Sequence, residues 1–338
     1  MVAAPPRGPF VTRSARARLL HRAAPLLDRV MQPVTWLAAR QMRLLRALTP
    51  PGAPRNFALL DRAGIYPLID HYYEPLINLG RLTRPLSERR RIAGLDFGLE
   101  RARVALAVLE GLDCPGQSAA QAVGMAYDPS NTMFCPLDAG ALYGVVLANR
   151  PRRIVEVGCG MSTLVFQSAL AELHRRDPEY KCEHVCIEPF EAQWLERLPV
   201  KVLRLTAEAA PPALLQALAP GDVLFIDSSH VIRPQGDVVT EVLEWLGELA
   251  PGVLVHIHDI YTPFDYPDEL LRRHRFLWNE QYLVEAFLCF NRSFEVLFPM
   301  HALWRDHATE VDLLCPSQRV RGRTTPSSLW LRRIEPGP

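Results

Sequence analysis

The chain has 338 residues, a formal net charge of +1, 49% hydrophobic residues and 22% charged residues, which is the composition of an ordinary globular protein. No run of about 18 apolar residues occurs, so we expect no transmembrane helix, and the amino terminus lacks the apolar core of a secretory signal. The seven cysteines form no Cys-x-x-Cys pair, which favours reduced thiols and a cytoplasmic location over a disulfide framework or a zinc knuckle. We interpret Cys182 and Cys186, near a predicted strand, as small core residues.

Charge is distributed unevenly along the chain. Ten arginines against one aspartate, Asp28, give residues 1–60 a charge of +9, which leaves −8 for the rest of a chain whose total is +1. The basic end could contact an anionic membrane surface, a nucleic acid or the acidic body of its own fold. We expect no nucleic-acid partner.

The amino-terminal third reads as a helical extension or cap over residues 15–128. Before it, residues 1–14 are rich in proline, alanine and arginine and are predicted to be a disordered tail. Residues 15–49 carry apolar side chains three or four positions apart, which predicts helices that Pro25 and Pro33 divide or kink.

The helical extension continues beyond a proline-rich segment at residues 49–54, which indicates a linker. Its clearest later helix is expected at residues 96–112. Three alternatives stay open for the basic helices: packing on the domain, forming a homodimer, or contacting a membrane surface. Arginines on several faces and the internal prolines weigh against the membrane.

Residues 129–334 read as one α/β domain. Short apolar runs, each predicting a strand, lie at 153–157, 184–187, 200–205, 222–226 and 253–258. Helical windows alternate with them at 163–175, 190–198, 212–218 and 238–249. A helix at 280–290 and strands at 294–298 and 327–333 complete the series. Fully apolar strands alternating with helices indicate a parallel sheet covered on both faces, so we predict a seven-stranded, mostly parallel, doubly wound sheet.

A Gly-x-Gly turn follows the first predicted strand at Gly158-Cys159-Gly160, before a helix that Ser162 or Thr163 can cap. Glycines let the backbone turn sharply and approach a ligand closely. Two details weigh against a nicotinamide dinucleotide. Thr163 occupies the place of the third glycine or alanine, and Glu156 puts a carboxylate where a pyrophosphate needs neutral amides. A carboxylate there suits the ammonium group of a methionine moiety.

An acidic residue, Glu188, follows the second predicted strand. A carboxylate at this place can hold both hydroxyls of a ribose, in a dinucleotide as well as in another nucleoside. The alternative interpretation is a carboxylate in a surface turn.

Polar residues follow the fourth and fifth strands. Asp227 and His230 come after the fourth, and His258 and Asp259 after the fifth. Because the carboxyl ends of neighbouring parallel strands meet at the edge where ligands bind, we expect these four side chains to converge. His256, inside the fifth strand, is interpreted as a hydrogen-bonded core histidine.

Together these motifs resemble a bacterial family of class I, Rossmann-like methyltransferases that use S-adenosylmethionine. The resemblance covers about residues 60–334, and its segments are 71–75, 133–134, 156–160, 187–189, 225–230, 256–260 and 278–283, with Asn291 and residues 294–296. It implies that Glu156, Gly158 and Gly160 line the methionine and adenosine portions of the cofactor. It also implies that Glu188 binds the ribose.

The resemblance implies as well that Asp227 lies under the methionine end or on a metal. Related O-methyltransferases hold a divalent cation with acidic residues after the fourth and fifth strands. The candidate metal ligands here are Asp227, His258 and Asp259. The histidine in this set favours a softer ion than Mg²⁺.

We predict an S-adenosylmethionine-dependent methyltransferase that methylates an oxygen of a small-molecule acceptor. Transfer from a sulfonium is an in-line displacement, which needs aligned partners and excluded water. The acceptor hydroxyl must lose its proton, either to a histidine or through a metal that acidifies it. The catalytic candidates are His230 or His258 as the base, with Asp259 and Asp227 orienting it or binding a cation.

Other interpretations of the same residues stay open. The polar side chains could merely cap strand ends and satisfy loop amides. The domain could be a non-catalytic module that binds S-adenosylmethionine and acts through a partner. A nicotinamide dehydrogenase is a third alternative, against which Thr163 argues. Tyr261, Phe264 and Tyr266, after the fifth strand, could form a lid over the acceptor or act as local packing anchors.

Overall fold

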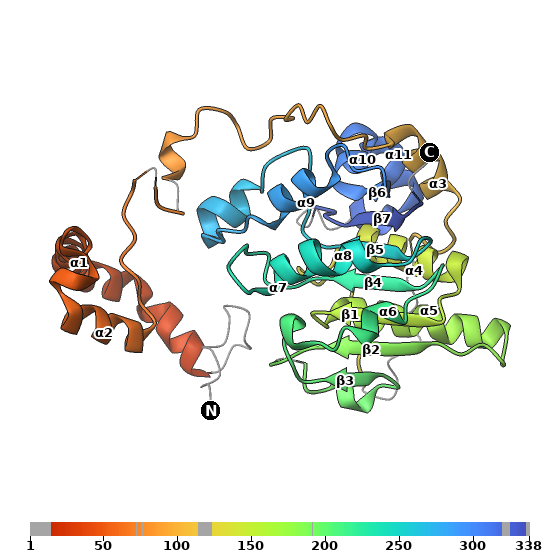
Figure 1. The fold of residues 1–338 in the computed structure, drawn as a ribbon, viewed down its shortest axis with the longest axis horizontal. Coiled ribbons are helices and arrows are strands. Elements are labelled where there is room, and N and C mark those ends of the chain that lie inside the picture. Colours follow the sequence, from red (N-terminus) through yellow and green to blue (C-terminus); the bar gives the residue numbers. More distant parts are fainter. Residues whose placement is uncertain are drawn as a thin grey trace. The chain divides into compact units, whose positions relative to one another are not determined.

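The computed structural model describes residues 15–71, 73–75, 78–113, 124–190, 192–319 and 325–335. The tail expected at residues 1–14 lies outside the described residues. The chain divides into two compact units, Met1–Thr83 and Arg84–Pro338 (Figure 1). The sequence ended the helical extension at residue 128, and that domain boundary stays a prediction.

Among its described residues, the first unit contains the α-helices α1 (Ala15–Gly52) and α2 (Pro54–Ala63) and a 3₁₀ turn, η1 (Leu79–Arg81). Helix α1 continues through Pro25 and Pro33 and breaks only at Thr49, where φ is 59°. Of the two expected effects, division at the prolines is wrong, because the surrounding leucines, alanines and arginines favour helix strongly enough to continue past two missing N–H groups, and a kink stays a prediction. The segment expected as a linker, residues 49–54, contains non-helical backbone at Thr49 and Ala53 and a helical turn at residues 50–52 between them, because a proline's fixed φ suits the first turn of a helix.

Helix α1 exposes an apolar face. Its residues lie three, four or seven positions apart and are 60–69% exposed: Leu26, Val30, Val34, Leu37 and Leu44. Within the part of the chain that the structure describes, no helix is both long and apolar enough to cross a membrane. A homodimer and contact with a membrane surface both stay predictions, as does the cytoplasmic location.

The second unit is built on one seven-stranded sheet in the order β3-β2-β1-β4-β5-β7-β6. The first five strands along the chain are parallel, and β7 runs antiparallel to both β5 and β6. The strands are β1 (Arg153–Val157), β2 (Glu183–Ile187), β3 (Lys201–Leu203), β4 (Val223–Ile226), β5 (Leu254–Ile257), β6 (Phe294–Pro299) and β7 (Leu329–Arg333). This confirms the predicted seven-stranded, mostly parallel sheet.

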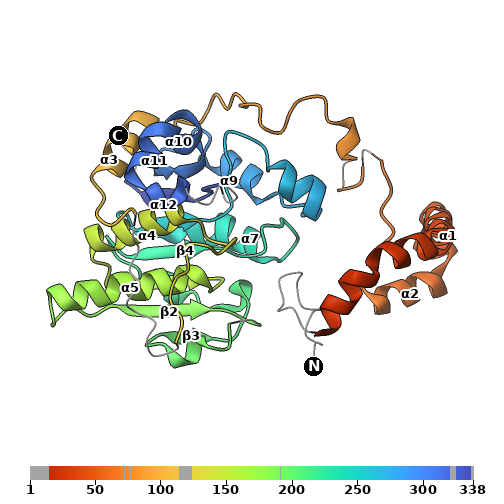
Figure 2. The ribbon, with the colours of Figure 1, turned by 180° about the vertical axis from the view of Figure 1, so that it is seen from behind.

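Helices cover both faces of the sheet, as can be followed from the two sides in Figures 1 and 2. One face carries α3 (Leu99–Ala107), α4 (Pro136–Asn149), α5 (Met161–Arg176), α10 (Met300–Asp306) and α11 (Ala308–Leu314). The other face carries α6 (Ala213–Gln216), α7 (Asp237–Val239), the π-helical turn η5 (Thr240–Trp245), α8 (Leu246–Glu248) and α9 (Glu280–Leu288). The sheet is therefore doubly wound.

The structure differs from the expected element series at three places. The helix expected at 190–198 is only a 3₁₀ turn, Leu195–Arg197, and the sequence did not indicate α10, α11 and the short helix α12 (Pro316–Arg319) between the last two strands. A second π-helical turn, η6 (Glu269–His274), follows β5.

Side chains of β1 alternate between the two faces, as a strand requires. Val155 and Val157 join the core under α6–α9, whereas Ile154 joins the core under α4 and α5. Glu156 follows the alternation of Ile154, so its carboxylate points into a packed layer. That placement decides what Glu156 can bind.

Candidate functional site

The carboxyl ends of β1 and β4 approach each other closely at Gly158. Its φ is 74° and its amide donates a hydrogen bond to the carbonyl of Ile187 at 3.1 Å. A Cβ atom on Gly158 would lie 1.8 Å from the carbonyl oxygen of Asp227. Only glycine therefore lets the strand end and the start of the next loop meet in this way.

Gly160 ends the same turn and directly precedes α5. Unlike Gly158, it makes no close contact with the described backbone that would require a glycine. Its amide donates to Thr163 Oγ1 at 3.1 Å. A Cβ built on Gly160 would meet no described protein atom within 4 Å. The turn therefore leaves open space on that side, as a turn that holds a ligand must.

Glu188 links the ends of β1 and β2. One carboxylate oxygen accepts from the amide of Phe190 at 2.9 Å, and the other from the amide of Cys159 at 3.4 Å. The side chain is mostly buried but keeps some exposed surface. It lies at the edge of the sheet where the sequence predicted a ribose-binding carboxylate, next to the glycine turn.

Three ionisable side chains meet at the ends of β4 and β5. His230 Nε2 lies 3.3 Å from Asp227 Oδ1 and 3.7 Å from Asp259 Oδ2. The three possible ligand atoms lie within 4.8 Å of one another, and the two aspartate side chains are 30% and 17% exposed. The sequence indicated His258 as the histidine of the candidate metal site. In the structure, His230 is the histidine that lies with the two aspartates.

A layer of buried acidic side chains supports this cluster from behind. Three consecutive residues of the loop after β4 donate to them: Ser228 Oγ to Glu241 at 2.8 Å, Ser229 Oγ to Asp237 at 2.7 Å and His230 Nδ1 to Glu280 at 2.8 Å. Glu241 comes from the π-helical turn η5 and Glu280 from the start of α9. The loop is therefore fixed at three consecutive positions, which leaves His230 Nε2 directed at the aspartates.

The acidic layer sets the charge of the cluster. Burial opposes the charge of the imidazole, but Asp227 and Glu280 raise the pKa of His230 well above its ordinary value. Burial also raises the pKa of Glu280, and burial together with the charge of Glu280 raises the pKa of Glu241 well above its usual range. The neighbouring acidic groups therefore favour the protonated form of the His230 imidazole.

A known protein family covers the segment that carries this arrangement. Residues 155–260 match the family model of a methyltransferase domain. The matched segment starts within β1 and ends just after Asp259, so it contains the glycine turn, Glu188 and the whole cluster. The chain carries a methyltransferase domain.

One curated relative of the methyltransferase domain is an uncharacterised protein of Archaeoglobus fulgidus. It is 26% identical over 137 residues, which are 38% of this chain and 60% of the relative. The chain therefore matches less than two thirds of that protein's own length.

Solved structures similar to the chain are also methyltransferases. They include Podospora anserina PaMTH1 bound to S-adenosylhomocysteine (SAH), at 15% identity and a TM-score of 0.38 over 60% of this chain and 81% of that one. MycE of the mycinamycin pathway, solved with Mg, SAH and mycinamycin VI, is 12% identical with a TM-score of 0.38 over 68% and 56% of the two chains. A methyltransferase-like protein of Thermobifida fusca is 18% identical with a TM-score of 0.38 over 69% and 94%. Similarity at this level assigns no substrate to the methyltransferase domain.

Glu156 lies behind the glycine turn of the methyltransferase domain. It has no exposed surface. One carboxylate oxygen accepts from Ser162 Oγ at 2.7 Å and Thr163 Oγ1 at 3.0 Å, and the other lies 2.9 Å from His184 Nε2. Direct contact between Glu156 and a cofactor ammonium stays a prediction. The observed hydrogen bonds from Ser162 and Thr163 show that Glu156 stabilises the start of α5.

The two histidines of β5 are both buried. His256 Nε2 lies 2.8 Å from Ser328 Oγ, and its ring stacks on Phe225 at 3.9 Å, which confirms a hydrogen-bonded core histidine. His258 Nε2 lies 3.3 Å from the carbonyl of Met133 and 3.9 Å from Asp259 Oδ1. His258 therefore borders the cluster rather than completing it, and its catalytic role stays a prediction.

The aromatic residues after β5 are packing anchors. Tyr261, Phe264 and Tyr266 are all at most 5% exposed. The Tyr261 hydroxyl donates to Asp259 Oδ1 at 3.0 Å, and its ring contacts Tyr266 and His301. These contacts fix the loop that carries Asp259, which favours the packing interpretation over a lid.

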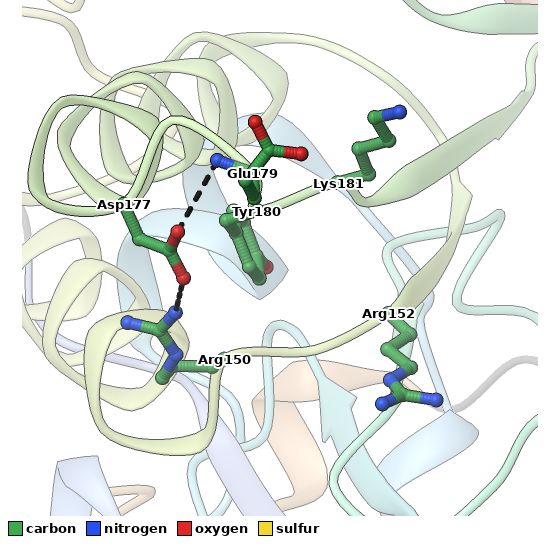
Figure 3. A pocket seen from close by; sticks show the side chains of 6 residues that line it. All are labelled: Arg150, Arg152, Asp177, Glu179, Tyr180 and Lys181. Carbon is green, nitrogen blue, oxygen red and sulfur yellow. Dashed lines mark hydrogen bonds and ion pairs between the residues drawn. The ribbon is translucent and has the colours of Figure 1, made fainter.

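A cavity of about 530 Å³ lies elsewhere in the methyltransferase domain, and six residues that directly precede β1 and β2 line it: Arg150, Arg152, Asp177, Glu179, Tyr180 and Lys181. Figure 3 shows Arg150 bonded to Asp177, while Arg152 and Lys181 project on the other side of the hollow. Because ligands of parallel sheets bind at the carboxyl ends of the strands, this hollow at their amino ends is not the candidate active site.

Sequence reasoning missed the acidic layer. Glu280 lies in a segment that carries the family resemblance, but no role followed from its position. Glu241 lies among apolar residues in a predicted helical window, and that position is the signal that could have pointed to it. The structure buries its side chain fully, which is rare for a glutamate.

Proposed function

We propose that the methyltransferase domain transfers a methyl group from S-adenosylmethionine to a hydroxyl of a small molecule. The observation that carries this proposal is the meeting of Asp227, His230 and Asp259 directly beside the glycine turn. A cofactor in the turn would place its methyl group next to groups that can position and deprotonate an acceptor.

The turn and Glu188 supply the cofactor site. Open space beside Gly160 leaves room for the cofactor, and α5 directs its free N–H groups toward the same turn. Glu188 can accept hydrogen bonds from both ribose hydroxyls while its own turn stays fixed by Phe190.

His230 and the two aspartates act on the acceptor as one unit. Glu280 holds Nδ1 of His230, so Nε2 is the atom that takes the acceptor's proton. Asp227 and Asp259 position the hydroxyl for in-line attack. Because the pKa of His230 is raised, this base role requires conditions that leave the imidazole neutral.

The same three side chains fit a divalent cation. Two carboxylates and one imidazole within 4.8 Å offer hard and borderline donors, a set that suits Mn²⁺, Mg²⁺ or Zn²⁺. The bond from His230 to Glu280 is the outer contact that metal-binding histidines usually have. A bound cation would supply Lewis acidity that lowers the pKa of an acceptor hydroxyl.

Binding and turnover test the proposal separately. Calorimetry with S-adenosylmethionine, SAH and NAD identifies the cofactor. Release of SAH during incubation with hydroxylated small molecules, with and without Mn²⁺ or Mg²⁺, measures transfer. Asp259→Asn removes a cluster carboxylate, and Asp177→Asn is the matched control because Asp177 lies at the opposite edge of the sheet in an exposed pair with Arg150.

We expect wild type and both variants to bind S-adenosylmethionine with similar affinity. Asp259→Asn should lower the transfer rate by about 100-fold or more, which is where the usual range for general acid–base catalysis begins, while Asp177→Asn leaves it unchanged. Binding of S-adenosylmethionine without transfer to any acceptor would instead indicate a non-catalytic module. Tight binding of NAD alone would overturn the proposal.

A further inference from the structure

A second cluster of metal-binding residue types lies behind the glycine turn, on the opposite side from the cofactor site. Glu156 comes from β1 and His184 and Cys186 from β2, and their ligand atoms lie within 4.8 Å of one another. All three side chains are at most 3% exposed. The rest of the layer between α5 and the sheet is packed with apolar side chains, among them Ile154 of β1 and Phe166 of α5. Packing alone therefore does not account for three polar or ionisable side chains here.

The distances in this cluster leave room for a zinc ion bound by three side chains. His184 Nε2 lies 2.9 Å from Glu156 Oε2, and Cys186 Sγ lies 3.7 Å from each of these two atoms. A point just above the plane of the three atoms is about 2.0 Å from the nitrogen and the oxygen and about 2.3 Å from the sulfur, which are the bond lengths of zinc to such ligands. The ligand atoms of Glu156, His184 and Cys186 can therefore reach one ion from their present positions.

Each ligand is also oriented by a neighbour that is not a ligand. Ser162 and Thr163 hydrogen bond to the other oxygen of Glu156. Gln167 Nε2 lies 2.9 Å from His184 Nδ1, and rotation of its amide by 180° presents the oxygen to a protonated Nδ1. Outer contacts of this kind fix histidine and carboxylate ligands in known metal sites.

A fourth donor completes the set. The nearest further thiol is that of Cys159 in the glycine turn, whose Sγ lies 3.8 Å from the carbonyl oxygen of Glu156, outside the group of three ligand atoms, so the Cys159 side chain must shift to reach the ion. Two thiolates, one imidazole and one carboxylate are donors that favour Zn²⁺ over Mg²⁺ or Ca²⁺. We propose that Glu156, His184, Cys186 and Cys159 bind a structural zinc ion that fastens the glycine turn to β1 and β2.

Binding would exchange protons for the ion. Zn²⁺ takes the place of the proton between His184 Nε2 and Glu156 Oε2, and the cysteines bind as thiolates, so the displaced protons go to solvent. No oxidation or reduction occurs. The inference is independent of methyl transfer, since it uses none of the side chains that would act on the acceptor.

Metal analysis of the purified full-length chain tests this site. Protein from zinc-supplemented culture is dialysed and its zinc measured per chain, alongside Cys186→Ala, Asp259→Asn and the matched control Cys182→Ala, whose cysteine lies outside the cluster just before β2. We expect close to one zinc per chain in the wild type, Asp259→Asn and Cys182→Ala, and its loss in Cys186→Ala. A strong chelator should lower the melting temperature of the first three proteins only.

Cobalt gives a readout that does not depend on the folding of any variant. Co²⁺ added to chelator-treated wild type should produce the thiolate-to-metal charge-transfer absorption and the intense visible bands of a tetrahedral site. Substoichiometric zinc in the wild type would overturn the proposal. Cobalt that binds without thiolate absorption would also overturn it, because the cobalt would then lie at Asp227, His230 and Asp259. A disulfide between Cys159 and Cys186 in the freshly purified chain would overturn it as well.

Discussion

The two glycines of the turn should respond oppositely to alanine. Gly158→Ala places a Cβ 1.8 Å from a backbone carbonyl, that of Asp227, on a residue with a φ of 74°. A left-handed φ costs a non-glycine residue about 1–2 kcal/mol, and the overlap forces the ends of β1 and β4 apart, since a backbone atom cannot rotate away. We expect a total loss of at least about 3 kcal/mol, which is at the upper end for single substitutions.

Gly160→Ala is the matched variant two residues later. The new Cβ meets no described protein atom within 4 Å, and φ is −170°, so unfolding free energy should change by less than about 1 kcal/mol. Because the methyl group enters the space proposed for the cofactor, SAH affinity should fall by about 10-fold or more, equivalent to at least about 1.4 kcal/mol.

Chemical denaturation and calorimetry measure the two effects side by side. The expected pattern is low stability for Gly158→Ala and native stability with weak SAH binding for Gly160→Ala. The steric reasoning fails if Gly158→Ala unfolds like the wild type. The placement of the cofactor fails if Gly160→Ala binds SAH as tightly as the wild type does.

Three further outcomes follow from other side chains. Glu188→Ala should weaken cofactor binding by about 1–3 kcal/mol through lost charged hydrogen bonds, and unchanged affinity in calorimetry would remove Glu188 from the site. Glu280→Gln should lower Mn²⁺ affinity by about 10- to 100-fold but leave SAH affinity within about twofold; a parallel fall in both would indicate damage to the fold instead. Burial lowers the pKa of His301 to about 4 from an ordinary value of about 6.5, so the unfolded state binds the extra proton first and stability is lost as pH falls from about 6.5 to about 4. His301→Gln should remove up to about 3 kcal/mol of this loss of stability at low pH. Unfolding free energies of the wild type and the variant at pH 7 and pH 4.5 measure the effect, and an unchanged pH dependence would contradict it.

The sequence by itself determined the sheet and the positions along the chain where polar side chains leave it. Five apolar runs separated by helical windows can bury both faces only as parallel strands, and the turn at Gly158 follows directly from the end of the first run. Asp227 and Asp259 could be predicted to lie near each other because both directly follow neighbouring central strands.

The tertiary structure decided which side chains act together. His230 and His258 have equal standing in the sequence, but the left-handed backbone at His230, where φ is 60°, and its bond to Glu280 turn that imidazole toward the aspartates. Glu280 lies 50 residues farther along the chain, and no local pattern predicts contact over such a separation.

Strand alternation and packing also decided the direction of Glu156. Its position two residues before the turn indicates a cofactor ligand, yet its side chain lies on the face covered by α5, where it meets His184 from the next strand. Local sequence fixes backbone conformation through a few neighbouring residues, whereas the partner of a buried charge depends on which distant strand packs beside it.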